Sequence, residues 1–172
     1  MTIAEATTRT VEVPGATLTY DVRVNDASTE PPLFLIGSPM AAAGFGTLAG
    51  HFADRTVITY DPRGSERSTK ADPMSRSTPE DHAEDLHRII QEVGGGPVDL
   101  FASSGGAVNA LALVSKYPED VRALVAHEPP LASQLPDREN AMAAARAINA
   151  TYERSGWGAG MAHFIAVVSH RG

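Results

Sequence analysis

The residues best suited to chemistry form a cramped corner, Ala102-Ser103-Ser104-Gly105-Gly106, between two apolar runs. A serine hydroxyl is a weak nucleophile, so a catalytic serine must be exposed, beside a base, with N–H donors waiting for the oxyanion. A tight strand-to-helix turn supplies the exposure and the donors, because the first N–H groups of a helix have no partner within it. Such a turn needs small residues two positions before and after the serine, as here. We expect Ser104 to be the nucleophile and Gly105 N–H to be an oxyanion donor.

Strand and helix patterns alternate along the chain on both sides of this corner. Residues 10–24 alternate between apolar and polar types around a Pro-Gly pair, which predicts a β-hairpin. Short apolar runs predict strands at 33–37, 56–60, 98–102 and 121–126. Spacing, caps and stop signals predict helices at 45–52, 79–93 and 104–117. This order predicts the α/β class, with a mostly parallel sheet, helices on both faces and ligand binding beyond the carboxyl ends of the strands.

The residues after 130 follow a different pattern. Residues 137–156 and 157–172 read as two helices, and no strand pattern follows them. We therefore expect an incomplete core at 1–130, a helical cap or lid at 131–172, and a chain truncated after the first lid helices. The second helix carries an apolar stripe that either lines a pocket or packs the lid on the core: Trp157, Met161, Phe164, Ile165 and Val168.

Three motifs in one chain order carry a resemblance to a known family. The corner "ASSGG" resembles the nucleophile elbow G-x-S-x-G of α/β-hydrolases, with alanine in place of the first glycine. The segment "LFLIGSPM" is similar to the family's oxyanion strand and loop, and "YDPRGSERS" is similar to its D-x-R-G-x-G-x-S loop. Together they cover roughly one hundred residues, which is more specific than any one motif. The resemblance implies an α/β-hydrolase-like fold for the N-terminal portion of the family pattern.

Two positions depart from that pattern. Ile36 stands where the family usually has histidine, and Glu66 stands at the second glycine of the middle motif. A plain glycine-rich turn, or a dinucleotide phosphate loop, is the alternative interpretation of the corner. The fingerprint G-x-G-x-x-G is absent, however, and the turn follows a late strand rather than the first. The nucleophile interpretation is therefore favoured.

The resemblance also implies roles for individual residues. It implies an oxyanion hole built from the backbone N–H groups of Ser38 and Gly105, which needs no particular side chain at 38. The family's triad runs in the order serine, acid, histidine, and the strands that usually precede the acid and the histidine are not evident before Gly172. Glu128 occupies a position from which some members supply the acid. The alternative for Glu128 is a rim carboxylate held by backbone N–H groups or solvent.

The histidines offer no obvious base for Ser104. His127 is expected to face away from its neighbour Glu128, because side chains alternate along a strand. The others are expected to lie on flanking helices or on the predicted lid: His51, His82, His87, His163 and His170. Asp61 and Arg63 are expected to fasten their loop through an ion pair rather than act on substrate.

Composition excludes several function classes. Fourteen Lys and Arg stand against 21 Asp and Glu, a net charge of −7, which disfavours nucleic-acid binding. The chain has no cysteine, which removes thiolate nucleophiles and thiolate zinc sites, and no histidine pair has a compact metal spacing. No cofactor or metal is expected. Neither a signal peptide nor a membrane-spanning run is evident, so we expect a cytoplasmic protein that does not bind membranes.

Two functions remain open at this point. The first is a serine hydrolase acting on a small ester, lactone or related acyl compound through an acyl-enzyme on Ser104. Serine at the elbow argues against dehalogenases and epoxide hydrolases of this fold, which carry aspartate there. The second is a truncated, catalytically inactive relic or a fragment that needs a partner chain. In that case an exposed sheet edge would invite a homodimer or pairing with another chain. The substrate and the oligomeric state are not determined by the sequence.

Overall fold

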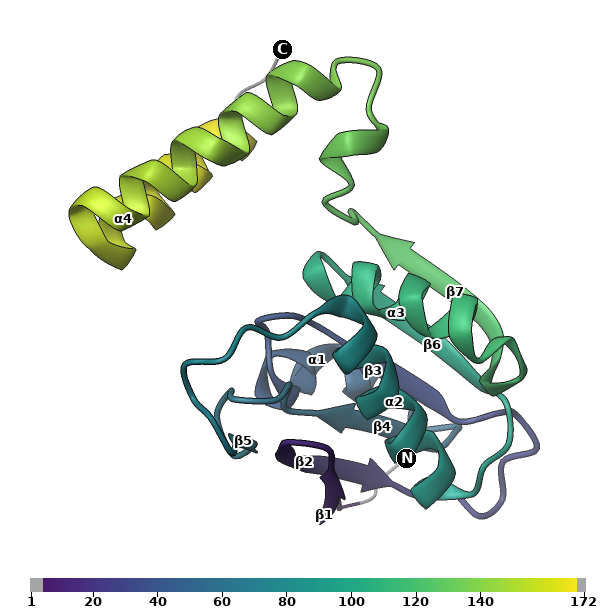
Figure 1. Ribbon diagram of the computed structural model, residues 1–172. Helices are drawn as coiled ribbons and strands as arrows, with labels where there is room; N and C mark the ends of the chain where they lie inside the picture. The colour runs from purple at the N-terminus through teal and green to yellow at the C-terminus, as the bar shows by residue number, and fades with distance from the viewer. Residues whose placement is uncertain (1–4, 170–172) are drawn as a thin grey trace. The chain divides into compact units, whose positions relative to one another are not determined.

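The computed structural model describes residues 5–169. It divides the chain into two compact units, Met1–Pro130 and Leu131–Gly172. The first unit carries the sheet and the second is helical (Figure 1).

The first unit is built on a seven-stranded sheet of order β1-β2-β4-β3-β6-β7, with β5 paired to β2. Its strands are β1 (Thr7–Val13), β2 (Ala16–Arg23), β3 (Leu33–Ile36), β4 (Val57–Tyr60), β5 (Thr69–Lys70), β6 (Val98–Ser103) and β7 (Val121–His127). β1 and β2 form an antiparallel hairpin, β2 pairs antiparallel with β4, and β4, β3, β6 and β7 are parallel. The predicted α/β class, hairpin and mostly parallel sheet are therefore confirmed. The two-residue strand β5 lies in a stretch that the sequence indicates only as a polar loop.

Helices connect the parallel strands. They are η1 (Ala42–Phe45), α1 (Gly46–Gly50), α2 (Pro79–Val93), α3 (Gly105–Lys116) and η2 (Pro118–Asp120). α2 begins as predicted, because Thr78 Oγ1 accepts a hydrogen bond from Asp81 N–H and the Asp81 carboxylate accepts one from Thr78 N–H. The helix predicted at 45–52 begins earlier and is irregular, with a 3-10 turn in η1 before the short α1.

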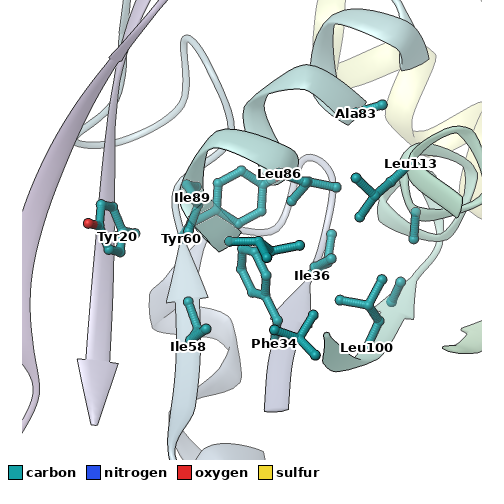
Figure 2. Close-up of a cluster of buried hydrophobic side chains, with 14 of the residues drawn as sticks. Tyr20, Phe34, Ile36, Ile58, Tyr60, Ala83, Leu86, Ile89, Leu100 and Leu113 are labelled. Carbon is teal, nitrogen blue, oxygen red and sulfur yellow. The ribbon is translucent and has the colours of Figure 1, made fainter. Parts of the chain in front are cut away.

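Both faces of the sheet are covered by apolar packing. On one face, residues of α2 and α3 pack on the sheet around Tyr60, Phe34 and Ile36, as Figure 2 shows. On the other face, Phe45 of η1 and Ala49 of α1 pack on the strands. Helices on both faces were predicted from the strand-helix alternation, and the two clusters confirm them.

β7 forms one end of the sheet. It pairs with β6, and no other strand of the described residues 5–169 pairs with it. Its Val125 side chain is 59% exposed, which is unusual for a valine in a parallel strand. Arg122, at the start of the strand, donates hydrogen bonds to Asp99 of β6 at 2.6 and 2.8 Å. This edge is therefore charged at its start and apolar further along.

The second unit consists of η3 (Ala132–Gln134) and α4 (Arg138–Val168). α4 is interrupted at Gly156, which has φ +81° and lies where the sequence predicts the boundary between two helices. The two halves fold back on each other: a Cβ at Gly160 would lie 2.9 Å from the Cβ of Tyr152, and Thr151 Oγ1 lies 2.9 Å from His163 Nδ1. The predicted stripe from Trp157 to Val168 is exposed. None of the helices within residues 5–169 combines the length and the apolar character that a membrane span requires.

Candidate active site

Ser104 lies at a sharp turn between β6 and α3. Its backbone has φ +56° and ψ −126°, and it precedes the first helical residue, Gly105. A non-glycine residue with positive φ is rare and is concentrated at functional sites. Ser104 N–H donates to the carbonyl of His127 at 2.9 Å, which fastens the turn to β7. The residue is exposed, so the predicted strand-turn-helix corner is present.

The positions two residues before and after Ser104 are both buried. Ala102 is fully buried in the core. A Cβ on Gly106 would lie 2.8 Å from the Cα and the carbonyl carbon of Gly37 and from the carbonyl oxygen of Ile36. These contacts are backbone atoms that no rotamer change can relieve. The end of β3 therefore leaves room only for glycine at 106.

The loop after β3 lies directly against the elbow. A Cβ on Gly105 would lie 2.7 Å from the carbonyl oxygen of Ser38, so the backbones of these two residues are neighbours. The following peptide, Ser38–Pro39, is cis. Among the turn, loop and cap hydrogen bonds within residues 5–169, none uses the N–H of Ser38 or of Gly105. The structure thus brings together the two residues that the family resemblance implied for an oxyanion hole.

The two departures from the family motifs have different structural consequences. Ile36 is fully buried in the main core cluster and contributes packing. Glu66 has φ +48°, the left-handed conformation that favours the glycine of the motif. Glu66 is therefore less suited to this backbone conformation than a glycine would be.

Asp61 and Arg63 both form ion pairs, but not with each other. Asp61 accepts hydrogen bonds from Arg67 Nε at 2.6 Å and from Ala42 N–H at 3.0 Å. Arg63 binds Asp85 of α2 through Nε at 2.7 Å and Nη2 at 2.5 Å. These hydrogen bonds raise the pKa of Arg63. The expected fastening of the loop is present. Arg67 comes from the loop itself, whereas Asp85 and Ala42 come from α2 and η1, which sequence spacing cannot indicate.

Glu128 follows β7 and is exposed, with φ +50°. It comes one residue after His127, whose carbonyl oxygen accepts the hydrogen bond from Ser104 N–H. A second strained residue therefore lies at the same edge of the sheet as Ser104. Its proposed role as an acid stays a prediction.

A contact that sequence reasoning missed joins the last residue of the elbow strand β6 to the last residue of β7. Ser103 pairs with His127 in register, and Ser103 Oγ lies 3.1 Å from His127 Nδ1. The imidazole also stacks on Phe101, with ring centroids 6.1 Å apart. Phe101 packs against the α1-side cluster, so Ser103, two positions further along β6, lies on that face too. The alternation of side chains along β6 and β7 could have placed both residues on one face, but the register that pairs them has no local signal.

His82 and His87 both lie on α2. Burial and the nearby Arg63 charge lower the pKa of His82 to about 4, and its Nδ1 has no hydrogen-bond partner. His87 Nδ1 lies 2.6 Å from Asp120 Oδ2, and its ring stacks on Tyr117. Both imidazoles are thus occupied in packing the α2 flank, as the sequence indicated.

The other histidines are placed elsewhere. His51 is exposed beside α1, and His163 is bonded to Thr151 within the second unit. His170 lies outside the described residues. Within residues 5–169 no histidine is hydrogen-bonded to Ser104, and no cluster of three metal-ligating side chains is found.

The family follows from a comparison of the whole sequence with known families. Residues 33–151 match the family described as alpha/beta hydrolase fold, and this stretch contains all three motifs. The chain belongs to the α/β hydrolase fold family. The strand order and the elbow at Ser104 agree with this assignment.

Two curated relatives are similar to part of the chain. Hydrolase YraK of Bacillus subtilis, which is itself uncharacterized, is 37% identical over 132 residues, covering 76% of this chain and 47% of YraK. The 2-(acetamidomethylene)succinate hydrolase of Mesorhizobium japonicum is 35% identical over 95 residues, covering 55% of this chain and 34% of that protein. The chain thus spans less than half the length of either relative.

Solved structures share the fold. A candidate epoxide hydrolase from Pseudomonas aeruginosa superposes with a TM-score of 0.69 and 21% identity, covering 85% of this chain and 49% of that one. The N-acyl homoserine lactonase AidH, complexed with N-butanoyl homoserine, gives a TM-score of 0.59 and 20% identity, covering 69% of this chain and 43% of AidH. At these identities the superpositions show the fold alone.

Proposed function

We propose that this chain carries the nucleophile half of a serine hydrolase that acts on a small ester, lactone or related acyl compound. The observation that supports this most directly is the exposed, left-handed Ser104 between β6 and α3. Strain of this kind costs of order 1–3 kcal/mol and persists where the surroundings impose it. The names of the curated relatives, both hydrolases, point to the same reaction class.

The oxyanion is bound by two backbone N–H groups in this proposal. Gly105 N–H belongs to the first turn of α3, where it has no carbonyl partner in the helix. Ser38 lies against Gly105, and its N–H comes from the loop after β3. Removal of one such donor in other hydrolases costs about 10²–10³ in rate, so the pair is central to the proposal.

The reaction has two steps. Ser104 Oγ forms a bond to the acyl carbon, the bond from that carbon to the leaving oxygen breaks, and the serine proton ends on the departing alcohol. Water then cleaves the acyl-enzyme, which releases the carboxylic acid and restores the hydroxyl. Glu128, at the end of the neighbouring strand, is the acid that this chain would offer to a base.

A fluorophosphonate probe tests the proposal, because it reacts only with activated serines. Labelling is expected at Ser104 and is expected to fall below detection in Ser104→Ala. Ser103→Ala is the matched control, since its hydroxyl is adjacent in sequence but bonded to His127 on the α1 face, and it should keep most of the labelling. Equal labelling of wild type and Ser104→Ala would refute the assignment.

The second candidate is a folded hydrolase relic without activity, or one that needs a partner chain at its sheet edge. It is favoured by one observation: no histidine within residues 5–169 is hydrogen-bonded to Ser104. Loss of a triad member typically removes several orders of magnitude of rate. Failure of the probe to label a folded chain would favour this candidate.

A further inference from the structure

A cavity of about 360 Å³ lies on the sheet, and the residues that line it are distant in sequence from Ser104. Asp21 and Arg23 of β2 and Thr59 of β4 contribute to its lining, and Asp21 pairs with Thr59 in register. These positions lie on the same face as Val57, which packs in the α1-side cluster. Ala42 and Gly46, from η1 and α1, also line it. Ser104 does not line this cavity.

The two aspartates of the cavity already have a cationic partner. Arg67 donates to Asp21 at 2.8 and 3.1 Å and to Asp61 at 2.6 Å. Asp61 also accepts from Ala42 N–H. Both carboxylates are therefore hydrogen-bonded before any ligand arrives, although the single guanidinium of Arg67 offsets only one of their two negative charges.

Arg23 is different, because its guanidinium has no such partner. No hydrogen bond or ion pair of its side chain is found within the described residues, and its Nη1 is fully buried and unbonded. Because Nη1 has almost no accessible surface, a ligand in the cavity would bind the other N–H groups of this unpaired guanidinium. A guanidinium offers donors in a planar fork that matches an oxyanion.

We propose that this cavity binds the carboxylate of a short aliphatic acid, with Arg23 as its cationic anchor. A singly charged carboxylate suits the site better than a phosphate dianion, because Asp21, Asp61 and the exposed Glu66 would repel a second negative charge. Alanine and glycine in η1 and α1 provide an apolar wall for a few methylene groups. The volume lies within the range of small-molecule sites.

Butyrate is the probe that tests the proposal, titrated into the isotope-labelled chain at low chloride. The expected result is saturable shifts of resonances around the cavity, including Arg23 Nε–Hε, with a dissociation constant on the order of 1 mM for so small a ligand. Arg23→Gln should weaken binding about tenfold or more, and Arg23→Lys less, because it keeps the charge and loses the fork. Glu66→Gln should strengthen binding about twofold by removing an exposed repulsive charge.

Two controls locate the site. Arg76→Gln removes an exposed arginine that does not line the cavity and should leave the affinity unchanged. Ser104→Ala should also leave it unchanged, which separates this site from the elbow. Circular dichroism checks that each variant is folded. The absence of saturable shifts, an unchanged affinity in folded Arg23→Gln, or phosphate binding as tightly as butyrate would each overturn the proposal.

Discussion

Acidification should destabilise the first unit through His82. This side chain is only 12% exposed, and its Nδ1 is buried without a hydrogen-bond partner. Burial, with smaller contributions from Arg63 and Lys70, lowers its pKa from 6.5 to about 4. Below pH 6.5 the unfolded chain therefore binds a proton that the folded chain refuses.

The size of the effect follows from the difference between the two pKa values. The contribution is complete above pH 6.5, where the imidazole is neutral in both states, and is lost as the pH falls from 6.5 to about 4. Each unit of pKa difference corresponds to about 1.4 kcal/mol, so the complete loss is roughly 3 kcal/mol. Between pH 7 and pH 5 the expected loss is about 2 kcal/mol.

Urea unfolding measures this directly. The free energy of unfolding is determined at pH 7, 6 and 5 by linear extrapolation, for wild type and for His82→Gln, which cannot take up the proton. Far-UV circular dichroism is the suitable signal, because Trp157, the single tryptophan, lies in the second unit. Carboxylate titration is common to both proteins and largely cancels in the comparison. The pH dependence of His82→Gln should be flatter by about 2 kcal/mol over this range.

His51→Gln is the matched control, because His51 is exposed. It should leave the wild-type pH dependence unchanged. If His82→Gln and wild type lose the same free energy between pH 7 and pH 5, the burial of His82 does not control acid stability and the reasoning fails.

Three further substitutions test the loops around the elbow. Glu66→Gly should raise the free energy of unfolding by roughly 0.5–1 kcal/mol. Glycine relieves the strain of the positive φ, and the larger conformational entropy of glycine in the unfolded chain offsets part of this gain. A loss of stability in urea melts would contradict this prediction. Gly106→Ala should lower the free energy of unfolding by about 1–3 kcal/mol and reduce fluorophosphonate labelling, because the new Cβ would lie 2.8 Å from backbone atoms. Unchanged labelling and stability would show that the elbow is not so tightly packed. Asp85→Ala should lower the free energy of unfolding by about 3–5 kcal/mol by leaving Arg63 buried without its partner, and a thermal melt within experimental error of wild type would refute this.

Local patterns in the sequence were enough to predict the elements and their order. Alternation gave the hairpin, the cap at Thr78 gave the start of α2, and Gly156 marked the break in α4. The corner at Ser104 was predictable for the same reason, since a strand, a tight turn and a helix follow one another within a few residues. The short strand β5 and the 3-10 turn η1 were not predicted. β5 depends on its pairing with the distant strand β2, and Ala42 N–H at the start of η1 donates to the distant Asp61.

Tertiary structure alone decided which side chains meet. Asp61 pairs with Arg67 and Arg63 with Asp85, although Asp61 and Arg63 are closer in sequence to each other. The Ser103–His127 contact depends on the register of β6 and β7, which no local pattern specifies.

The sequence by itself determined the fold class, because that class follows from the order of strand and helix patterns along the chain. It also determined the position of the candidate nucleophile, because that position depends on residues within one strand-turn-helix unit. Only the folded chain decided that Ser38 lies against Gly105, that Glu66 takes a left-handed backbone and that Arg23 is left without a partner. These features depend on contacts between segments that lie many residues apart. The physical reason is that close backbone approach and ion-pair choice are set by how the segments pack, and a sequence pattern records only the tendency of each segment to form.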